Sequence, residues 1–339
     1  MSAEKLKSEL DSIFKGQSSC LIALHSFPDP DALASGMGLK YYLEQRFSLD
    51  VSIAYGGLIG RAENRTMVKV LDIPLKKMGR IKLPAYDRIA MVDAQPTQKN
   101  LALDEEKPCQ VIIDHHPVKR EGKREGVWID TSVGATAVMI YELLELIEVR
   151  IPAKLATAMV YAIRSETQDL GRKAGERDIR AYLDLFPLAN MKDISKIVHP
   201  TLPRNYFQNL IHALKHTYTY RHIMVSHLED VPYPEMVAEF ADFLLRLERH
   251  TWVLCTGRYR NDLILSMRTT HKEGDAGEVI KALVPDESMA GGHEQFAGGA
   301  VPLDLEESRE MKEITWEISR RFASCLDMEK ADWKPLVKG

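Results

Sequence analysis

The chain has 339 residues, of which 45% are hydrophobic and 28% charged, and its formal net charge is −4. This length predicts two domains, and the composition is that of a soluble globular protein. The net negative charge argues against a global basic field that would coat long duplex DNA, but not against a local basic pocket for a short nucleotide.

The four cysteines, Cys20, Cys109, Cys255 and Cys325, contain no CxxC pair, which favours reduced thiols in a cytosolic protein. The first 16 residues read as an amphipathic helix without the apolar core of a signal peptide. Because no apolar run approaches about 18 residues, no membrane span is predicted. We therefore expect a cytoplasmic protein with no membrane partner.

Strand and helix patterns alternate through the first domain, residues 1–190. The expected strands are 20–25, 51–55, 88–92 and 110–113, and the expected helices are 32–47, 134–146, 154–163 and 175–185. Such alternation predicts an α/β fold with a mainly parallel, doubly wound sheet and helices on both of its faces.

The pattern changes at residues 191–221, which we interpret as a connector with Pro200, Pro203 and a helical run over 206–218. Residues 222–339 then predict a smaller α+β domain. Its expected strands are 222–228, 252–259 and 263–269, and its expected helices are 235–247, 276–283 and 306–325, with a glycine-rich loop before the last helix.

Carboxylates and histidines follow three of the expected strands in the first domain. The first strand leads to His25, Asp29 and Asp31, and the next two lead to Asp93 and to the triplet 114–116. Ligands bind beyond the carboxyl ends of parallel strands, so these side chains should converge on one crevice. Pro28 and Pro30 stiffen the first loop and hold its two carboxylates apart.

Mixed histidine and carboxylate ligands suit Mn²⁺, or less well Fe²⁺, Co²⁺ or Zn²⁺, better than Ca²⁺ or Mg²⁺. One carboxylate and the imidazole can serve one ion, the other carboxylate can serve a second ion, and Asp93 is placed to bridge them. Two ions about 3.5–4 Å apart would clamp a phosphoryl group for in-line attack by an activated water.

Each residue also has a simpler interpretation when taken alone. A single aspartate at a strand end is usually a helix cap or a turn residue, and a single histidine is usually a hydrogen-bonding group. Three acid and histidine clusters at three successive strand ends are not explained in this way. Their combination indicates a two-metal site.

These motifs resemble those of the DHH phosphoesterase superfamily. The pattern His25-x-x-x-Asp29-x-Asp31 resembles its first motif, Asp93 its second, and Asp114-His115-His116 the triplet that gives the family its name. The resemblance implies that His115 binds metal and that His116 contacts the substrate phosphate or assists the leaving group. Asp114 would orient its neighbour.

The second domain resembles the small substrate-binding domain of the family's first branch. Its signature is a Gly-Gly-His loop, here Gly291-Gly292-His293, which a strand arginine, here Arg268, precedes. Arginine suits bidentate phosphate recognition, and glycines let backbone amides approach phosphate oxygens. The resemblance covers roughly residues 18–322.

The family's fourth motif supplies a bridging aspartate after a helix, and this sequence places Glu166 there. Glutamate is one methylene longer and ligates only if the backbone recedes or the carboxylate rotates. Asp169 is the alternative ligand. A weakened site is the third alternative, and it would give a slow enzyme or a nucleotide-binding regulatory protein.

Two further segments have two interpretations each. Arg61, Asn64 and Arg65 either approach the substrate, or Asn64 caps a helix between exposed arginines. Residues 132–137 open a helix whose first amides either hold a phosphate or are simply capped.

The resemblance implies an enzyme that hydrolyses short oligonucleotides, as nanoRNases do, or 3′-phosphoadenosine 5′-phosphate, with two divalent ions, most readily Mn²⁺. Its partner is then a short oligonucleotide or small nucleotide. The alternative is a phosphodiesterase for cyclic di-AMP or its linear product pApA. A homodimer is compatible with the resemblance and with the frequency of such dimers.

Overall fold

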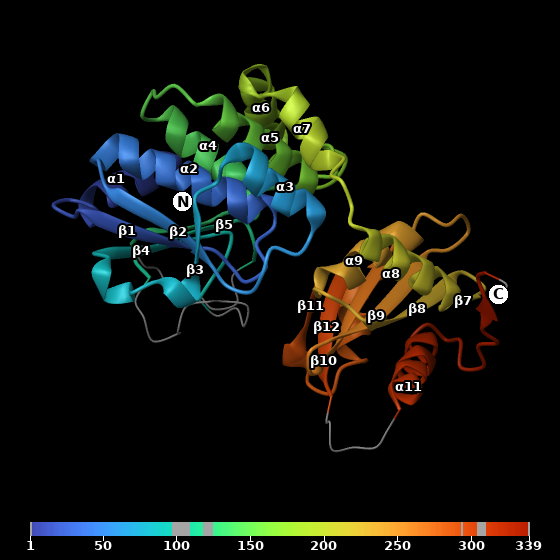
Figure 1. The fold of residues 1–339 in the computed structure, drawn as a ribbon. Helices are drawn as coiled ribbons and strands as arrows, with labels where there is room; N and C mark the ends of the chain where they lie inside the picture. The colour runs from blue at the N-terminus through green and yellow to red at the C-terminus, as the bar shows by residue number, and fades with distance from the viewer. Residues whose placement is uncertain (1, 97–108, 118–124, 293, 304–309, 338–339) are drawn as a thin grey trace. The chain divides into compact units, whose positions relative to one another are not determined.

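The computed structural model describes residues 2–96, 109–117, 125–292, 294–303 and 310–337. The chain divides into two compact units, Met1–Pro200 and Thr201–Gly339. Each unit contains its own sheet (Figure 1). Each also has its own hydrophobic core. None of the helices in the described ranges combines the length and apolar composition needed to cross a membrane.

The first unit is built on a six-stranded sheet with the order β3-β2-β1-β4-β5-β6. Its strands are β1 (Ser19–Ala23), β2 (Asp50–Tyr55), β3 (Leu75–Lys77), β4 (Arg88–Val92), β5 (Val111–Asp114) and β6 (Val127–Ile129). Every pair of neighbours is parallel, so all carboxyl ends lie along one edge. The predicted α/β fold with a mainly parallel sheet is confirmed.

Seven helices of the first unit are α1 (Ala3–Ile13), α2 (Pro30–Phe47), α3 (Ala62–Leu71), α4 (Thr136–Glu145), α5 (Ala153–Glu166), α6 (Glu176–Leu185) and α7 (Met191–Val198). They gather on one side of the sheet (Figure 1). There the central helix α2 contacts β1, β2 and β4 as well as α4 and α5. A side chain at Gly38 of α2 would come within 2.6 Å of Ile140, so glycine permits this close helix packing.

The opposite face of the sheet has a different covering. We expected α-helices on both faces, but in the described ranges the second face packs against residues of the segment 78–86. This segment forms two short 3₁₀ turns, η1 (Met78–Arg80) and η2 (Leu83–Ala85). Its apolar side chains Met78, Ile81, Leu83 and Tyr86 are partly buried against the sheet.

The second unit contains a seven-stranded mixed sheet with the order β11-β12-β10-β9-β8-β7-β13. Its strands are β7 (Thr217–Tyr220), β8 (Ile223–Asp230), β9 (Trp252–Tyr259), β10 (Asp262–Thr269), β11 (Ala290–Gly292), β12 (Phe296–Pro302) and β13 (Lys334–Pro335). Only the β8–β9 pair is parallel.

In the described part of the second unit, helices cover both faces of this sheet. Helices α8 (Arg204–Lys215) and α9 (Glu235–Leu244) contact strands β8 to β10, and α10 (Ala276–Lys281) and α11 (Met311–Ser324) belong to the core on the other face. The expected start of the last helix, Glu306, lies outside the described residues, and α11 begins at Met311.

The expected connector 191–221 is divided between the two units. Helix α7 belongs to the first unit, and α8 and β7 belong to the second. The expected glycine-rich loop also differs, because its glycines form strands β11 and β12, which pair with each other.

Candidate metal centre

The loop after β1 brings three of the predicted ligands together. Asp29 is the N-cap of α2 and accepts hydrogen bonds from the backbone amides of Asp31 and Ala32 at 3.0 and 2.9 Å. Pro30 is favourable at the start of the helix because its missing N–H would have no partner there. Asp31, in the first turn of α2, is completely buried.

Asp93 and the triplet follow the next two strands of the sheet. Asp93 directly follows β4 in a left-handed conformation with φ of 54°, which aspartate and asparagine tolerate better than most residues. Asp114 is the last residue of β5, and His115 and His116 follow it. The strand order reverses between the neighbouring strands β1 and β4. Open parallel sheets usually bind their ligands at such a reversal.

The two oxygens of Asp93 face two different histidines. Its Oδ2 lies 3.7 Å from Nε2 of His25, and its Oδ1 lies 3.7 Å from Nε2 of His115. Each histidine has a second carboxylate nearby: Asp29 lies 3.9 Å from His25, and Asp31 lies 3.8 Å from His115. Asp93 is therefore shared by two groups of donor atoms.

These separations fit shared ligation of an ion. They exceed hydrogen-bond length, yet two donors that each lie about 2.1 Å from one ion can be up to about 4.2 Å apart. The donors of His25, Asp29 and Asp93 lie within 4.8 Å of one another, and so do those of Asp93, His115 and His116. The described residues thus form two overlapping candidate metal-binding groups.

Both histidines are oriented by backbone carbonyls. Nδ1 of His25 is 2.9 Å from the carbonyl of Ser26, and Nδ1 of His115 is 3.4 Å from that of Val133. When Nδ1 carries the proton, Nε2 presents its lone pair, as in most metal-bound histidines. Nε2 of His115 is buried without a hydrogen-bond partner, and a metal ion would satisfy it.

The charges of the site also favour the binding of cations. Burial raises the pKa of Asp31 well above its usual value, and the charges of Asp93, Glu166 and Asp29 add to the effect. Burial likewise raises the pKa of Glu166 to about 8, again with contributions from Asp29 and Asp93. These carboxylates repel one another, and divalent cations between them would remove the repulsion.

Asp114 holds His116 through a direct hydrogen bond. Its Oδ1 lies 2.8 Å from Nδ1 of His116, and the amide of Gln95 donates to its Oδ2 at 2.7 Å. Burial opposes protonation of His116, but the bond to Asp114 and the charges of Asp93 and Asp114 prevail and raise its pKa to about 9. The nitrogen of His116 nearest to Asp93, at 3.7 Å, is also this Nδ1, so Asp114 competes with any metal for it.

The segment 133–137 contacts three of these residues, and we call it the anchoring loop. The carbonyl of Val133 faces His115, and the amides of Thr136 and Ala137 donate to Asp31 at 2.6 and 2.8 Å. The hydroxyl of Thr136 donates to Asp93 at 3.0 Å. The helix N-terminus that we considered for phosphate therefore binds the Asp31 carboxylate with these two amides.

Asp178 of α6 holds the anchoring loop in place through a hydrogen bond. It is completely buried, and it accepts hydrogen bonds from the amides of Gly134 and Gly175 at 2.7 and 2.9 Å. Nothing in the local sequence marked Asp178 or Gln95 as important, and Thr136 was considered only as part of the segment 132–137. Each of the three has a partner that is distant in sequence, at 44 residues for Asp178, 19 for Gln95 and 43 for Thr136.

Asn64 contacts a loop of the metal centre and does not cap its helix. The N-cap of α3 is Arg61, so the cap interpretation is wrong. Asn64 lies inside the helix, is 3% exposed, and donates to the carbonyl of Pro28 at 3.3 Å. It therefore supports the loop that carries His25 and Asp29.

The two candidates for the sixth ligand differ in their surroundings. Glu166, the last residue of α5, interacts electrostatically with Asp29, Asp31 and Asp93. Asp169 is exposed, and its carboxylate accepts a hydrogen bond from Arg164 at 2.6 Å. The acidic surroundings of Glu166 therefore favour it over Asp169 as the proposed sixth ligand.

A Glu166→Gln variant should bind Mn²⁺ roughly tenfold more weakly, because a charged group beside the other carboxylates is lost. An Asp169→Asn variant is the matched control and should bind Mn²⁺ like the unmodified protein. Metal content after dialysis against a range of Mn²⁺ concentrations measures both. The reverse pattern would assign the sixth position to Asp169.

Three of the predicted substrate residues of the second unit lie on strands β10 and β11, which β12 separates in the sheet. Arg268 of β10 pairs with Phe296 of β12, and its guanidinium contacts Asp242, the hydroxyl of Ser266 and the ring of Phe296. Gly291 and Gly292 form part of β11, and a Cβ at Gly292 would come within 2.4 Å of Phe296 O. His293 lies outside the described residues.

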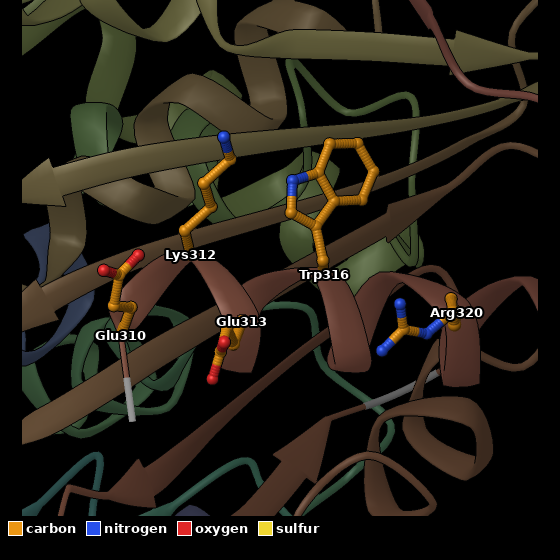
Figure 2. Close-up of a pocket in the computed structure, with 5 residues that line it drawn as sticks. All are labelled: Glu310, Lys312, Glu313, Trp316 and Arg320. Carbon is orange, nitrogen blue, oxygen red and sulfur yellow. The ribbon is translucent and has the colours of Figure 1, made fainter. Parts of the chain in front are cut away.

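A surface cavity runs beside α11 in the second unit (Figure 2). Glu310, Lys312, Glu313, Trp316 and Arg320 line it, so it combines two acidic, two basic and one aromatic side chain. None of them belongs to the predicted site. Trp316 packs edge-on against Tyr218 with ring centres 4.9 Å apart, which gives the indole a structural role.

Several curated proteins are similar to this sequence. The chain is 30% identical over 286 residues to an uncharacterized protein of Methanocaldococcus jannaschii, with 84% of this chain and 58% of the relative aligned. It is 25% identical over 174 residues to a probable manganese-dependent inorganic pyrophosphatase of Lactiplantibacillus plantarum, with 50% of this chain and 55% of that protein aligned. The chain thus spans little more than half the length of these relatives.

Among solved structures, the fold is similar to that of an exopolyphosphatase-related protein from Bacteroides fragilis. The TM-score is 0.77 at 15% identity, and 96% of this chain and 98% of that chain are covered. The family model for the N-terminal domain of the DHH family matches residues 19–163. That range contains His25, Asp29, Asp31, Asp93 and the triplet, so these residues lie within the part of the chain that matches the N-terminal domain of the DHH family.

Proposed function

We propose that this protein is a metal-dependent phosphoesterase that uses two divalent ions, most readily Mn²⁺. One observation carries the proposal: the two oxygens of Asp93 face His25 and His115 separately, each at 3.7 Å. This arrangement suits two ions that share one carboxylate. The manganese dependence in the name of the pyrophosphatase relative supports the choice of metal.

The ligands divide into two sets that share Asp93. His25 and Asp29 would complete one set, and Asp31 and His115 the other, with Glu166 nearby. A bound pair of such ions supplies Lewis acidity toward a phosphoryl group and makes water more acidic. The remaining tasks belong to the protein's own side chains.

Those tasks are orientation and contact with the substrate. Ser26 and Val133 fix the rings of His25 and His115 through their carbonyl groups. Asp114 engages Nδ1 of His116 and leaves Nε2 for a phosphate oxygen or the leaving group. Because Gln95 holds the other oxygen of Asp114, the aspartate and the imidazole form one positioned unit.

For the substrate, we propose a short oligonucleotide or 3′-phosphoadenosine 5′-phosphate. The net charge of −4 and the resemblance of the second domain to a small substrate-binding domain support a short nucleotide over long duplex nucleic acid. Arg268, Gly291, Gly292 and His293 are the residues that we propose for its recognition.

A substrate panel with Mn²⁺ tests this proposal. The full chain is assayed with pApA, 3′-phosphoadenosine 5′-phosphate, cyclic di-AMP and inorganic pyrophosphate, and a His116→Ala variant serves as the matched negative control. We expect turnover of at least one of the first two, and its loss in the variant. Turnover of pyrophosphate alone, or of no compound, would refute the proposal, and preference for cyclic di-AMP would support the alternative phosphodiesterase.

A further inference from the structure

A dense group of positive charges follows β3 in the first unit. Lys76, Lys77, Arg80 and Lys82 lie within seven residues, and all four are exposed. No acidic residue occurs between Asp72 and Asp87. In a chain whose net charge is −4, four positive charges in so short a segment are a local concentration. We call these four residues the basic edge.

The basic edge lies at the same edge of the sheet as the metal-binding groups. Lys77 is the last residue of β3, which pairs in parallel with β2, which in turn pairs in parallel with β1. The carboxyl ends of these strands therefore point the same way (Figure 1). His25 follows β1 at this edge, and Arg80 and Lys82 follow β3.

A short series of contacts connects the basic edge to the metal-binding loop. Lys77 donates to the carbonyl of Gly57 at 2.5 Å and lies 4.3 Å from the ring centre of Tyr55. A Cβ at Gly57 would come within 3.0 Å of the ring of Phe27. Phe27 belongs to the loop between His25 and Asp29. The segment that Lys77 contacts therefore adjoins the loop that carries these two predicted metal ligands.

The four charges are not neutralised by carboxylates of the described residues. Lys76 donates to the hydroxyl of Ser52 at 2.9 Å, and Lys77 donates to a carbonyl. Neither these lysines nor Arg80 and Lys82 form an ion pair with an acidic side chain in the ranges that the structure describes. Among the described residues, no carboxylate therefore competes with an anion for these four side chains.

We infer that the basic edge binds additional phosphate groups of a substrate whose reacting phosphate lies at the metal-binding groups. The carboxylate cluster attracts cations, and the adjoining lysines and arginine attract phosphates. One edge of the sheet therefore carries a metal-binding region next to a phosphate-binding region. The partner is a linear anion with several phosphates, such as an oligonucleotide backbone or inorganic polyphosphate. The inference rests on the proposed function, because it extends the same site.

The test is an Arg80→Ala/Lys82→Ala double variant of the full chain. These two side chains are exposed, and neither belongs to the metal-binding groups. The matched control is Lys15→Ala/Lys192→Ala, which removes the same charge from exposed positions of the same unit. Lys15 precedes β1 and therefore lies toward the opposite edge of the sheet.

Binding is measured first, by fluorescence anisotropy with a labelled 5′-phosphorylated pentaadenylate at two or more salt concentrations. The double variant should bind roughly tenfold more weakly at low salt, and its log–log salt slope should be smaller by about 1.4, because two phosphate contacts are lost. The control variant should bind like the unmodified protein. Equal affinity and equal slope for all three proteins would overturn the inference.

Turnover then identifies the source of the phosphates and separates the two proposals. With pentaadenylate and with inorganic tripolyphosphate, the double variant should raise KM and leave kcat unchanged for the compound that the edge recognises. An unchanged KM for both compounds would contradict the inference even if hydrolysis is normal. Conversely, absence of any hydrolysis by the unmodified protein refutes the proposed function, while the binding measurement still decides the role of the basic edge.

Discussion

An Asp93→Asn variant is expected to bind no more than one Mn²⁺ per chain and to lose phosphoester hydrolysis by on the order of a thousandfold. Asp93 is the residue that both groups of donors share, and its two oxygens each face a different histidine. An amide has one oxygen and no charge, so it cannot serve two cations. Metal analysis after dialysis and the initial rate on the preferred substrate measure the two effects.

Asparagine is the appropriate replacement because it changes charge with little change in shape. Asp93 has a positive φ of 54°, which asparagine accepts, and asparagine can still accept the hydrogen bond from Thr136. The metal-free variant should be at least as stable as the metal-free parent, since one charge is removed from a crowded buried cluster. A large fall in its free energy of unfolding would assign Asp93 a structural role instead.

An Asp178→Ala variant should destabilise the protein by about 3 kcal/mol and weaken Mn²⁺ binding by roughly 10- to 100-fold. The substitution leaves the amides of Gly134 and Gly175 without their acceptor in a buried position. It also releases the anchoring loop, whose groups contact Asp31, Asp93 and His115. Denaturant unfolding of the metal-free form and a Mn²⁺ titration report the two effects separately.

Asp184 on the same helix provides the control for Asp178. Its side chain is 47% exposed, and it accepts a hydrogen bond from Tyr141 at 3.0 Å. An Asp184→Ala variant should change Mn²⁺ affinity little, because this residue does not contact the anchoring loop in the described structure. If both variants bind Mn²⁺ like the parent, Asp178 does not position the site.

The residues that could be predicted from the sequence are those that directly follow strands. His25, Asp93 and His115 could be placed at one edge because parallel strands share the direction of their carboxyl ends. The alternation of strand and helix patterns carried this information. The α/β class followed from the same alternation.

The supporting residues could not be predicted in this way. Thr136 contacts Asp93 and Asp178 contacts Gly134, each more than 40 residues away, so these contacts exist only in the folded chain. The first amides of α4 looked free for a phosphate, yet the carboxylate of Asp31 occupies two of them. The role of Asn64 could not be predicted for the same reason, because its hydrogen-bond partner, the carbonyl of Pro28, is 36 residues away.

The sequence pattern also did not predict which segments pack against the first sheet or which residues form the edge of the second. The segment 78–86 has too few apolar residues at regular spacing to predict an element, but its 3₁₀ turns cover one face of the first sheet. The glycines at 291 and 292 suggested a loop because glycine is common in turns. They pair instead with β12, where Gly292 lies too close to Phe296 and Ala297 for any side chain.

The sharing of Asp93 by two metal ions is tested most directly by titrating the metal-free protein with Mn²⁺ while its electron paramagnetic resonance spectrum is recorded. We predict two bound ions per chain with the spectrum of an exchange-coupled pair, because one carboxylate would join them at about 3.5–4 Å. One ion per chain, or two ions with the spectra of isolated Mn²⁺, would contradict a shared Asp93.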